Sequence, residues 1–258
     1  MSTFLTLLNK ELLEAWRDKK LIWLPIVLSV LAISQPITQY YMPQILDAAG
    51  NLPEGTIIEF PVPTGAEVLA GTLSQIGTIG TAIFVLSVMG SIVQERNSGA
   101  LSLVMARPVQ AYQYITSKWV ANAIILLASF IIGYGLSYYY TNILFEEVEI
   151  KRFFASLGVY SIWILFTLTA TLLAGTVFKK VGGVAGASLL TVAALALCGS
   201  LFPKFMGWSP SNALNHASSY LASGTWGDAF GTMMFSSIAL ILCVFGLTVY
   251  LFKKYESY

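Results

Sequence analysis

Six apolar stretches dominate the pattern of hydrophobic and polar positions along this chain of 258 residues. Each is long enough for a helix that crosses a bilayer, which needs about 20 mostly apolar residues. The stretches cover residues 21–41, 72–93, 119–141, 157–178, 181–202 and 232–252. The pattern predicts an all-α membrane protein in which residues 21–258 form one domain of six transmembrane helices.

The first 20 residues follow a different pattern, in which apolar and polar side chains separate at helical spacing. The apolar side chains are Phe4, Leu5, Leu8, Leu12, Ala15 and Trp16, and the polar ones are Asn9, Lys10, Glu14, Arg17 and Asp18. This pattern predicts an N-terminal amphipathic interfacial helix over residues 1–20, which lies in the inner headgroup layer and turns sharply into the first crossing. The alternative is a helix solvated in the cytoplasm.

Charged residues are scarce, and their distribution predicts the orientation of the chain. Hydrophobic residues make up 56% of the sequence and charged residues 10%, against about a quarter charged in soluble domains. With the N-terminus inside, eleven of the 14 Lys and Arg residues fall on the inner side. They are Lys10, Arg17, Lys19, Lys20, Arg96, Arg107, Lys118, Lys179, Lys180, Lys253 and Lys254, whereas Lys151, Arg152 and Lys204 fall outside. Because Lys and Arg concentrate in cytoplasmic loops, we expect a multi-pass protein of the cell membrane with both termini in the cytoplasm.

The sequence also excludes several kinds of chemistry. The interiors of the six stretches contain no Asp, Glu, Lys, Arg or His, which argues against proton-coupled transport, a voltage sensor or a charged channel ring. The chain has no GxxxxGK[ST] phosphate-binding loop, no GxSxG and no HExxH motif. Cys198 and Cys243 lie inside apolar stretches, where a cysteine usually packs as a small apolar residue. We therefore expect no catalytic, metal-binding or cofactor-binding residue in this chain, which is not an enzyme, and no nucleic-acid partner, since the net charge is only +1.

The polar segment 94–118 stands out between the second and third crossings. Apolar Leu101, Val104 and Met105 alternate at helical spacing with polar positions. The residue before a proline disfavours helix, so Arg107-Pro108 should end this first helix, and Pro108 can open the next. The segment is predicted as a helix–break–helix on the cytoplasmic face, which either passes a push from a soluble partner into the crossings or is a plain solvated connector.

This segment resembles the most recognisable stretch of the ABC-2-type permeases, the membrane half of ATP-binding-cassette transporters. Its matching positions are Glu95, Arg96, Gly99, Ala100, Leu101, Leu103, Ala106, Arg107, Pro108, Val109, Ser117 and Lys118. Ala100 stands where the family usually has Thr, and Ser117 where it usually has Gly. The whole plan of the chain, an interfacial helix followed by six crossings, also resembles the six-helix bacterial branch, and implies a type V exporter-like transmembrane domain.

The resemblance implies a role for several residues of the segment in coupling to an ATPase subunit. Glu95, Arg96 and Arg107 would make polar contacts with it, Gly99 and Pro108 would set the backbone path, and Lys118 would anchor the third crossing at headgroup level. Two copies of a cytoplasmic ATPase, which bind ATP and Mg, and a second permease half, identical or homologous, are the implied partners besides membrane lipids. The expected function is export of a drug, peptide or lipid-like substrate, and the alternative is a scaffold or sensor subunit that transports nothing.

The last outer loop, residues 203–231, contains signals for one more helix. Ser209 followed by Pro210 is typical of a helix start, and Gly224 of a helix end. We expect a short helix over about 210–222 on the outer surface, acting either as a gate at the exit or as a simple cap.

Overall fold

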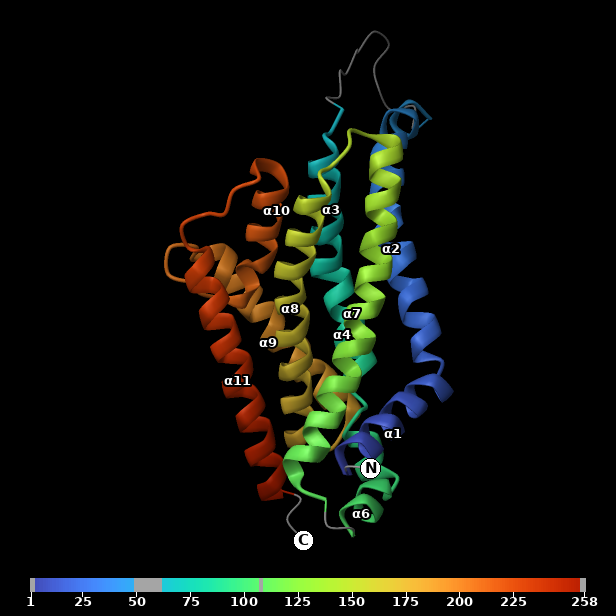
Figure 1. Cartoon of the computed structure of the whole chain (residues 1–258), viewed down its shortest axis with the longest axis vertical. Coiled ribbons are helices and arrows are strands. Elements are labelled where there is room, and N and C mark those ends of the chain that lie inside the picture. Colours follow the sequence, from blue (N-terminus) through green and yellow to red (C-terminus); the bar gives the residue numbers. More distant parts are fainter. Residues whose placement is uncertain (1–2, 49–61, 107–108, 256–258) are drawn as a thin grey trace.

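The computed structural model describes residues 3–48, 62–106 and 109–255. Within these ranges every regular element is a helix, and six helical segments are long and apolar enough to cross a membrane (Figure 1). They span Lys20–Ile45, Gly65–Asn97, Ala111–Leu144, Ile150–Val177, Val181–Leu201 and Phe230–Tyr255. The predicted all-α fold with six crossings is confirmed. Several helices begin earlier or end later than the apolar stretches, because hydropathy marks the hydrocarbon core and not the helix ends.

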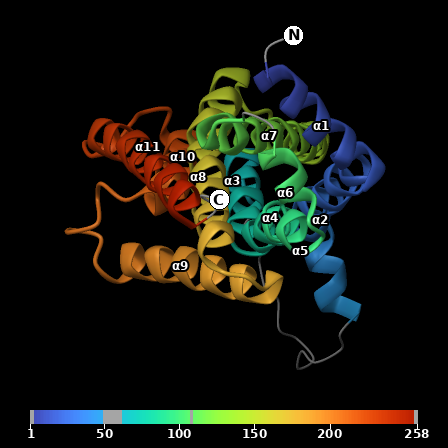
Figure 2. The same ribbon diagram turned by 90° about the horizontal axis from the view of Figure 1, so that it is seen from below.

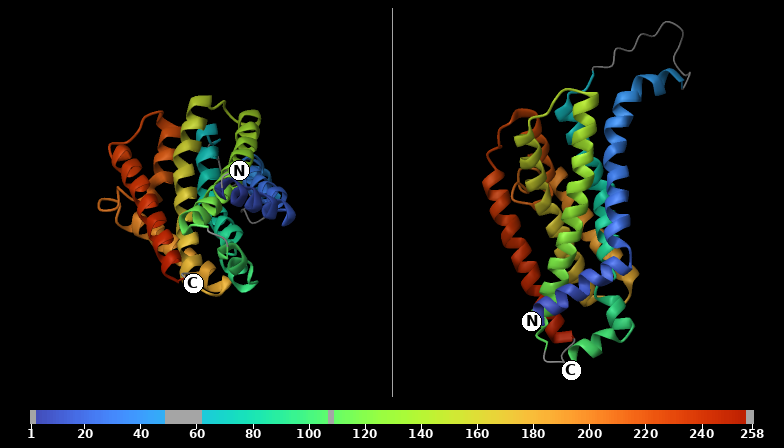
Figure 3. Two further views of the ribbon diagram at one scale, coloured as in Figure 1. Left: turned by 60° about the horizontal axis from the view of Figure 1, so that its bottom comes forward. Right: turned by 45° about the vertical axis from the view of Figure 1, so that its right-hand side comes forward.

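The N-terminal helix α1 (Thr3–Arg17) lies across one end of the bundle, the end that also holds the last turn of α11 (Phe230–Tyr255) (Figures 1 and 3). We call this end the base. Asp18 and Lys19 turn the chain into the upright helix α2 (Lys20–Ala48). Lys19 takes a left-handed conformation with φ of 54°, unusual for a residue with a side chain. The predicted sharp turn therefore occupies two residues, while the position of α1 in the headgroup layer stays a prediction.

The second crossing is built from four pieces, and not from one regular helix. It runs through α3 (Gly65–Gln75), the π-helical η1 (Ile76–Gly80), α4 (Thr81–Val88) and α5 (Val93–Asn97). The crossing begins at a capping box, in which Glu67 N–H donates to Thr64 Oγ1 (3.3 Å) and Thr64 N–H donates to Glu67 Oε2 (2.8 Å). At the base, α5 continues into α6 (Ala100–Met105).

The core of the bundle lies between α7 (Ala111–Leu144) and α8 (Ile150–Val177). Phe130 and Tyr134 of α7 stack with ring centroids 5.5 Å apart, and Tyr134 Oη lies 2.9 Å from Ser156 Oγ of α8. Gly133 lets α2 approach closely, since a Cβ there would lie 3.0 Å from the carbonyl of Leu28. By contrast, α9 (Val181–Leu201) and α11 are each 17% buried over their apolar windows. These two helices leave most of their surface to lipid or another chain.

The helix predicted in the last outer loop is present, with one face buried and one face exposed. Ser209 accepts a hydrogen bond from Ser211 N–H (3.3 Å), η2 (Pro210–Asn212) leads into α10 (Ala213–Ser223), and Gly224 ends it with φ of 71°. Its stripe of Ala213, Ala217 and Leu221 is completely buried, against α8 and α3. Leu221 was expected to turn toward lipid or protein, and it packs against protein, because these three apolar side chains share one helix face. The helix itself lies near the end of the bundle opposite the base (Figure 1).

Candidate functional site

A buried cluster of charged side chains joins three elements at the base of the bundle. Lys118 of α7 donates to Glu11 of α1, with Nζ 2.9 Å from Oε1 and 3.0 Å from Oε2, and to Glu95 Oε1 of α5 at 2.8 Å. Lys10 of α1 bonds to both carboxylates, and Tyr114 of α7 donates to Glu95 Oε2 at 2.6 Å. We call Lys10, Glu11, Glu95, Tyr114 and Lys118 the base cluster.

The local geometry of each helix brings these side chains together. Glu11 stands four residues after Leu7 and four before Ala15, so it shares the buried face of α1. On α7, Tyr114 and Lys118 are likewise four residues apart and point to the same side. This face exists because α7 starts at Ala111, well before its apolar stretch. Three helices thus meet through side chains rather than through backbone contacts alone.

The base cluster is electrically balanced. Lys118 is 1% exposed and Glu95 4% exposed, and buried charges are tolerated only when they are paired and hydrogen-bonded. Burial alone would lower the pKa of Lys10, but the carboxylates of Glu11 and Glu95 raise that pKa above its ordinary value. The ammonium groups of Lys10 and Lys118 therefore compensate the carboxylates of Glu11 and Glu95.

The same carboxylates raise the question of a metal ion. Oxygen atoms of Glu11, Glu14 and Glu95 lie within 4.8 Å of one another. However, Lys118 already donates to Glu11 and Glu95, and Lys10 Nζ lies 3.2 Å from Glu14 Oε2. The ammonium groups occupy the positions that a cation would take, so the geometry is that of an ion-pair network.

Arg96 ties α5 to a fourth helix, α8. Its guanidinium donates to the carbonyl oxygens of Phe178 (3.1 Å) and Thr176 (3.2 Å) at the end of α8. The last carbonyls of a helix have no partner within it, and a cation there is favourable for the helix dipole. Arg96 therefore caps α8 and holds α5 against the buried core of the bundle.

Beyond Arg96 the chain makes a tight turn and presents α6. Gly99 adopts φ of 77°, a conformation that side chains disfavour. In α6, Leu101 is 2% exposed and faces the bundle, whereas Leu103 is 75% exposed. Figure 1 shows α6 at the base, below the ends of the upright helices, and Figure 2 shows it close to α5. The segment α5–α6 thus has one face fixed to the bundle and one apolar side chain projecting away from it.

The structure shows where most residues with a predicted coupling role lie. Glu95, predicted to make polar contacts with an ATPase subunit, and Lys118, predicted to anchor the third crossing at headgroup level, are both buried in the base cluster and paired with each other. Their roles toward an ATPase and at the headgroup level stay predictions. Arg96, also expected to face a partner, uses its guanidinium on α8. Gly99 does set the backbone path, while Arg107 and Pro108 lie outside the described residues.

Sequence reasoning missed Lys10, Glu11 and Tyr114. The signal for Glu11 was present, because a carboxylate stands on the apolar face of a helix that is otherwise amphipathic. Its partner could not be identified, since Glu11 and Lys118 are far apart in sequence and meet only in the folded bundle.

Comparisons with known proteins agree with this architecture. Residues 23–252 match the family described as ABC-2 family transporter protein. A protein of Bacillus subtilis (strain 168), described as the uncharacterized transmembrane protein YxlG, is 44% identical over 258 residues, which cover 100% of both chains.

Proposed function

Because the chain belongs to the ABC-2 family of transporter membrane proteins, we propose that it is the permease subunit of an ATP-binding-cassette exporter driven by a separate cytoplasmic ATPase. The family match extends over 230 of the residues, 23–252, and so includes all of α5, α6 and α7. ATP and Mg would be bound by the ATPase, not by this chain.

The observation that carries this proposal is the attachment of α5–α6 to the bundle. The exposed Leu103 offers an apolar side chain to a groove on the ATPase. A movement of α6 would be passed on by α5 through the Glu95–Lys118 pair to α7 and through Arg96 to α8. Since α7 and α8 form the core, a displacement at the base moves the helices on which all others pack.

The assembly we propose has two ATPase subunits and a second permease half, identical or homologous. The base would face the cytoplasm, in agreement with the concentration of Lys and Arg in the termini and connecting segments predicted to lie on the inner side. The poorly buried α9 and α11 leave surface for lipids or for the second half. A drug, peptide or lipid-like compound is the proposed class of substrate.

Reconstitution tests this function. The chain and its ATPase are incorporated into proteoliposomes, and candidate compounds are screened for stimulation of ATP hydrolysis and for movement across the bilayer. We expect a compound to be moved only when both subunits and ATP are present. The control is an ATPase that binds but does not hydrolyse ATP. Stable association of the subunits without any stimulated hydrolysis or movement would favour the scaffold alternative.

A further inference from the structure

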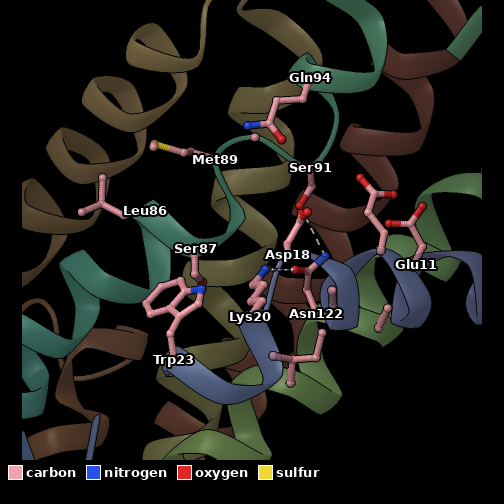
Figure 4. A pocket seen from close by; sticks show the side chains of 15 residues that line it. Glu11, Asp18, Lys20, Trp23, Leu86, Ser87, Met89, Ser91, Gln94 and Asn122 are labelled. Atoms are coloured by element: carbon pink, nitrogen blue, oxygen red, sulfur yellow. Dashed lines mark hydrogen bonds between the residues drawn. The ribbon is translucent and has the colours of Figure 1, made fainter. Parts of the chain in front are cut away.

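A pocket of about 190 Å³ lies next to the base cluster, between the turn that joins α1 to α2 and the junction of α4 with α5. Figure 4 shows Lys20, Trp23 and Asn122 on one side of it and Met89, Ser91 and Gln94 on the other. The coupling described above does not use this pocket.

The pocket contains a lysine that no carboxylate contacts directly, although the charges of Glu11, Asp18 and Glu14 act on it from farther away. Within the described part of the chain, Lys20 Nζ has no carboxylate within 4 Å, and its hydrogen bond is to Asn122 Oδ1 at 2.7 Å. Asn122 is held in this orientation because its Nδ2 donates to the carbonyl oxygen of Lys118 (2.8 Å). An ammonium group withdrawn from water normally has an anionic partner. The arrangement therefore leaves room for an anion beside Lys20.

An indole N–H is available on the same side. Among the described residues, Nε1 of Trp119 and of Trp163 each donate to a threonine hydroxyl, but Trp23 Nε1 has no such protein acceptor. Trp23 is the third residue after Lys20 on α2 and lines the same pocket (Figure 4). A phosphate oxygen accepts hydrogen bonds from both groups, as a carboxylate would.

The pocket also contains the opposite charge. Glu11, Glu14 and Asp18 all line it, and Glu11 is already bonded to Lys10 and Lys118. Glu14 is paired with Lys10 through one oxygen, and Asp18 is exposed and forms no ion pair with any residue the structure describes. The pocket thus combines an ammonium group with carboxylates that are not all paired, which fits a zwitterion better than a simple anion.

Apolar surface continues from the pocket along the bundle. Trp23 is 38%, Leu86 49% and Ile26 57% exposed, and all three belong to segments that cross the bilayer. Lys20 and Trp23 stand at the start of a crossing, the level at which aromatic and basic side chains meet lipid headgroups. Hydrocarbon chains attached to a ligand in the pocket would lie on this surface.

From these observations we propose that the pocket binds the headgroup of an aminophospholipid, with the phosphate at Lys20 and Trp23 and the primary ammonium at Asp18 and Glu14. The lipid would come from the leaflet in which the base lies. Binding there would bridge α1, α2, α4 and α5, next to the base cluster. This site does not depend on whether the lipid is also the transported compound.

Native mass spectrometry of the full chain, purified in detergent, tests the site. Phosphatidylethanolamine, phosphatidylcholine and phosphatidylglycerol with identical acyl chains are added one at a time, and the fraction of protein that retains one lipid is compared. The wild type is expected to retain phosphatidylethanolamine best, because the quaternary amine of phosphatidylcholine has no N–H to donate and phosphatidylglycerol has no amine.

Two variants test the contacts with the phosphate and with the ammonium group separately. Lys20→Met is expected to weaken phosphatidylethanolamine retention about tenfold, the loss typical of one hydrogen bond to a charged group. Asp18→Asn is expected to remove the preference over phosphatidylcholine. The matched control is Lys179→Met, which removes an exposed lysine away from the pocket and should leave retention unchanged.

Three results would overturn the proposal. They are equal retention of phosphatidylethanolamine and phosphatidylcholine by the wild type, wild-type retention by Lys20→Met, and an unchanged lipid preference in Asp18→Asn. If Lys20→Met does not fold, the exposed Asp18→Asn variant decides, since loss of a surface carboxylate leaves the packing intact.

Discussion

At the scale of single residues, the base cluster shows how buried charges can fix a segment in place. Lys118 is shared by two carboxylates from different helices, so each contact depends on the other. Pairs of this kind add little net stability compared with apolar packing, but removal of one partner is costly. Their contribution is positional, since they allow α1, α5 and α7 to meet in one arrangement.

The Lys118→Met variant tests the cluster directly. It would leave Glu11 and Glu95 buried without their shared cation, and we expect the free energy of unfolding to fall by about 3–5 kcal/mol. The measurement is thermal or denaturant unfolding in detergent. Lys180→Met, which replaces an exposed lysine, should stay within about 0.5 kcal/mol of the wild type. If the two variants had the same free energy of unfolding, Lys118 would not be the buried partner of Glu11 and Glu95.

Replacement of Gly99 by alanine tests the turn into α6. The positive φ disfavours any side chain by roughly 1–2 kcal/mol, although space is not the obstacle, because a Cβ there meets nothing within 4 Å. We expect faster hydrogen exchange of α6 amides with unchanged exchange in α8. Gly135→Ala is the control, since a Cβ at that helical glycine also has open space. Unaltered exchange in α6 would contradict a turn that depends on the left-handed glycine.

At the scale of elements, the sequence predicts the crossings well and their packing poorly. Hydropathy identifies the six apolar stretches because transfer into a bilayer depends on composition alone. The pieces of the second crossing could not be foreseen, since no sequence rule separates a π-helical turn such as η1 from the α-helix on either side of it. For α10 the capping signals at Ser209 and Gly224 predict the ends of the helix, but the depth at which it packs depends on α8 and α3.

The burial of α10 is tested by Leu221→Ala. Leu221 is completely buried, so truncation should leave a cavity and lower the free energy of unfolding by about 2–5 kcal/mol. The measurement is again unfolding in detergent, and Ser219→Ala, which changes an exposed position of the same helix, is the control. If Leu221→Ala and Ser219→Ala have the same free energy of unfolding, α10 is not packed into the bundle.

At the scale of the whole molecule, an apolar core between the long helices is joined at the base to a cluster of buried, paired charges. The coupling segment was predicted from its position after the second crossing and from the resemblance to a family. The interactions that hold it could not be predicted, because Lys10, Glu11 and Tyr114 come into contact with Glu95 and Lys118 only when α1, α5 and α7 pack together. Glu95 and Lys118 near the ends of crossings were expected at a partner and at headgroup level, and the fold pairs them with each other.

Cysteine labelling tests the orientation of the molecule. In a background in which the exposed Cys198 and Cys243 are replaced by serine, a single Leu103→Cys should react with a membrane-impermeant maleimide only after permeabilisation. A single Lys151→Cys, at an exposed position at the opposite end, should react in intact cells. Reaction of the cysteine at position 103 in intact cells would place the base outside.

The central claim is that α6 takes up the movement of a cytoplasmic ATPase, and co-purification of that ATPase with a tagged chain tests it most directly. Leu103→Asp places a charge on a side chain that is 75% exposed, so the fold should be kept while apolar docking is lost. The control is Tyr255→Asp, at a residue that is 60% exposed at the base end of α11. We predict that Leu103→Asp inserts normally and loses the ATPase while Tyr255→Asp retains it. Wild-type recovery of the ATPase by Leu103→Asp would contradict this role of α6.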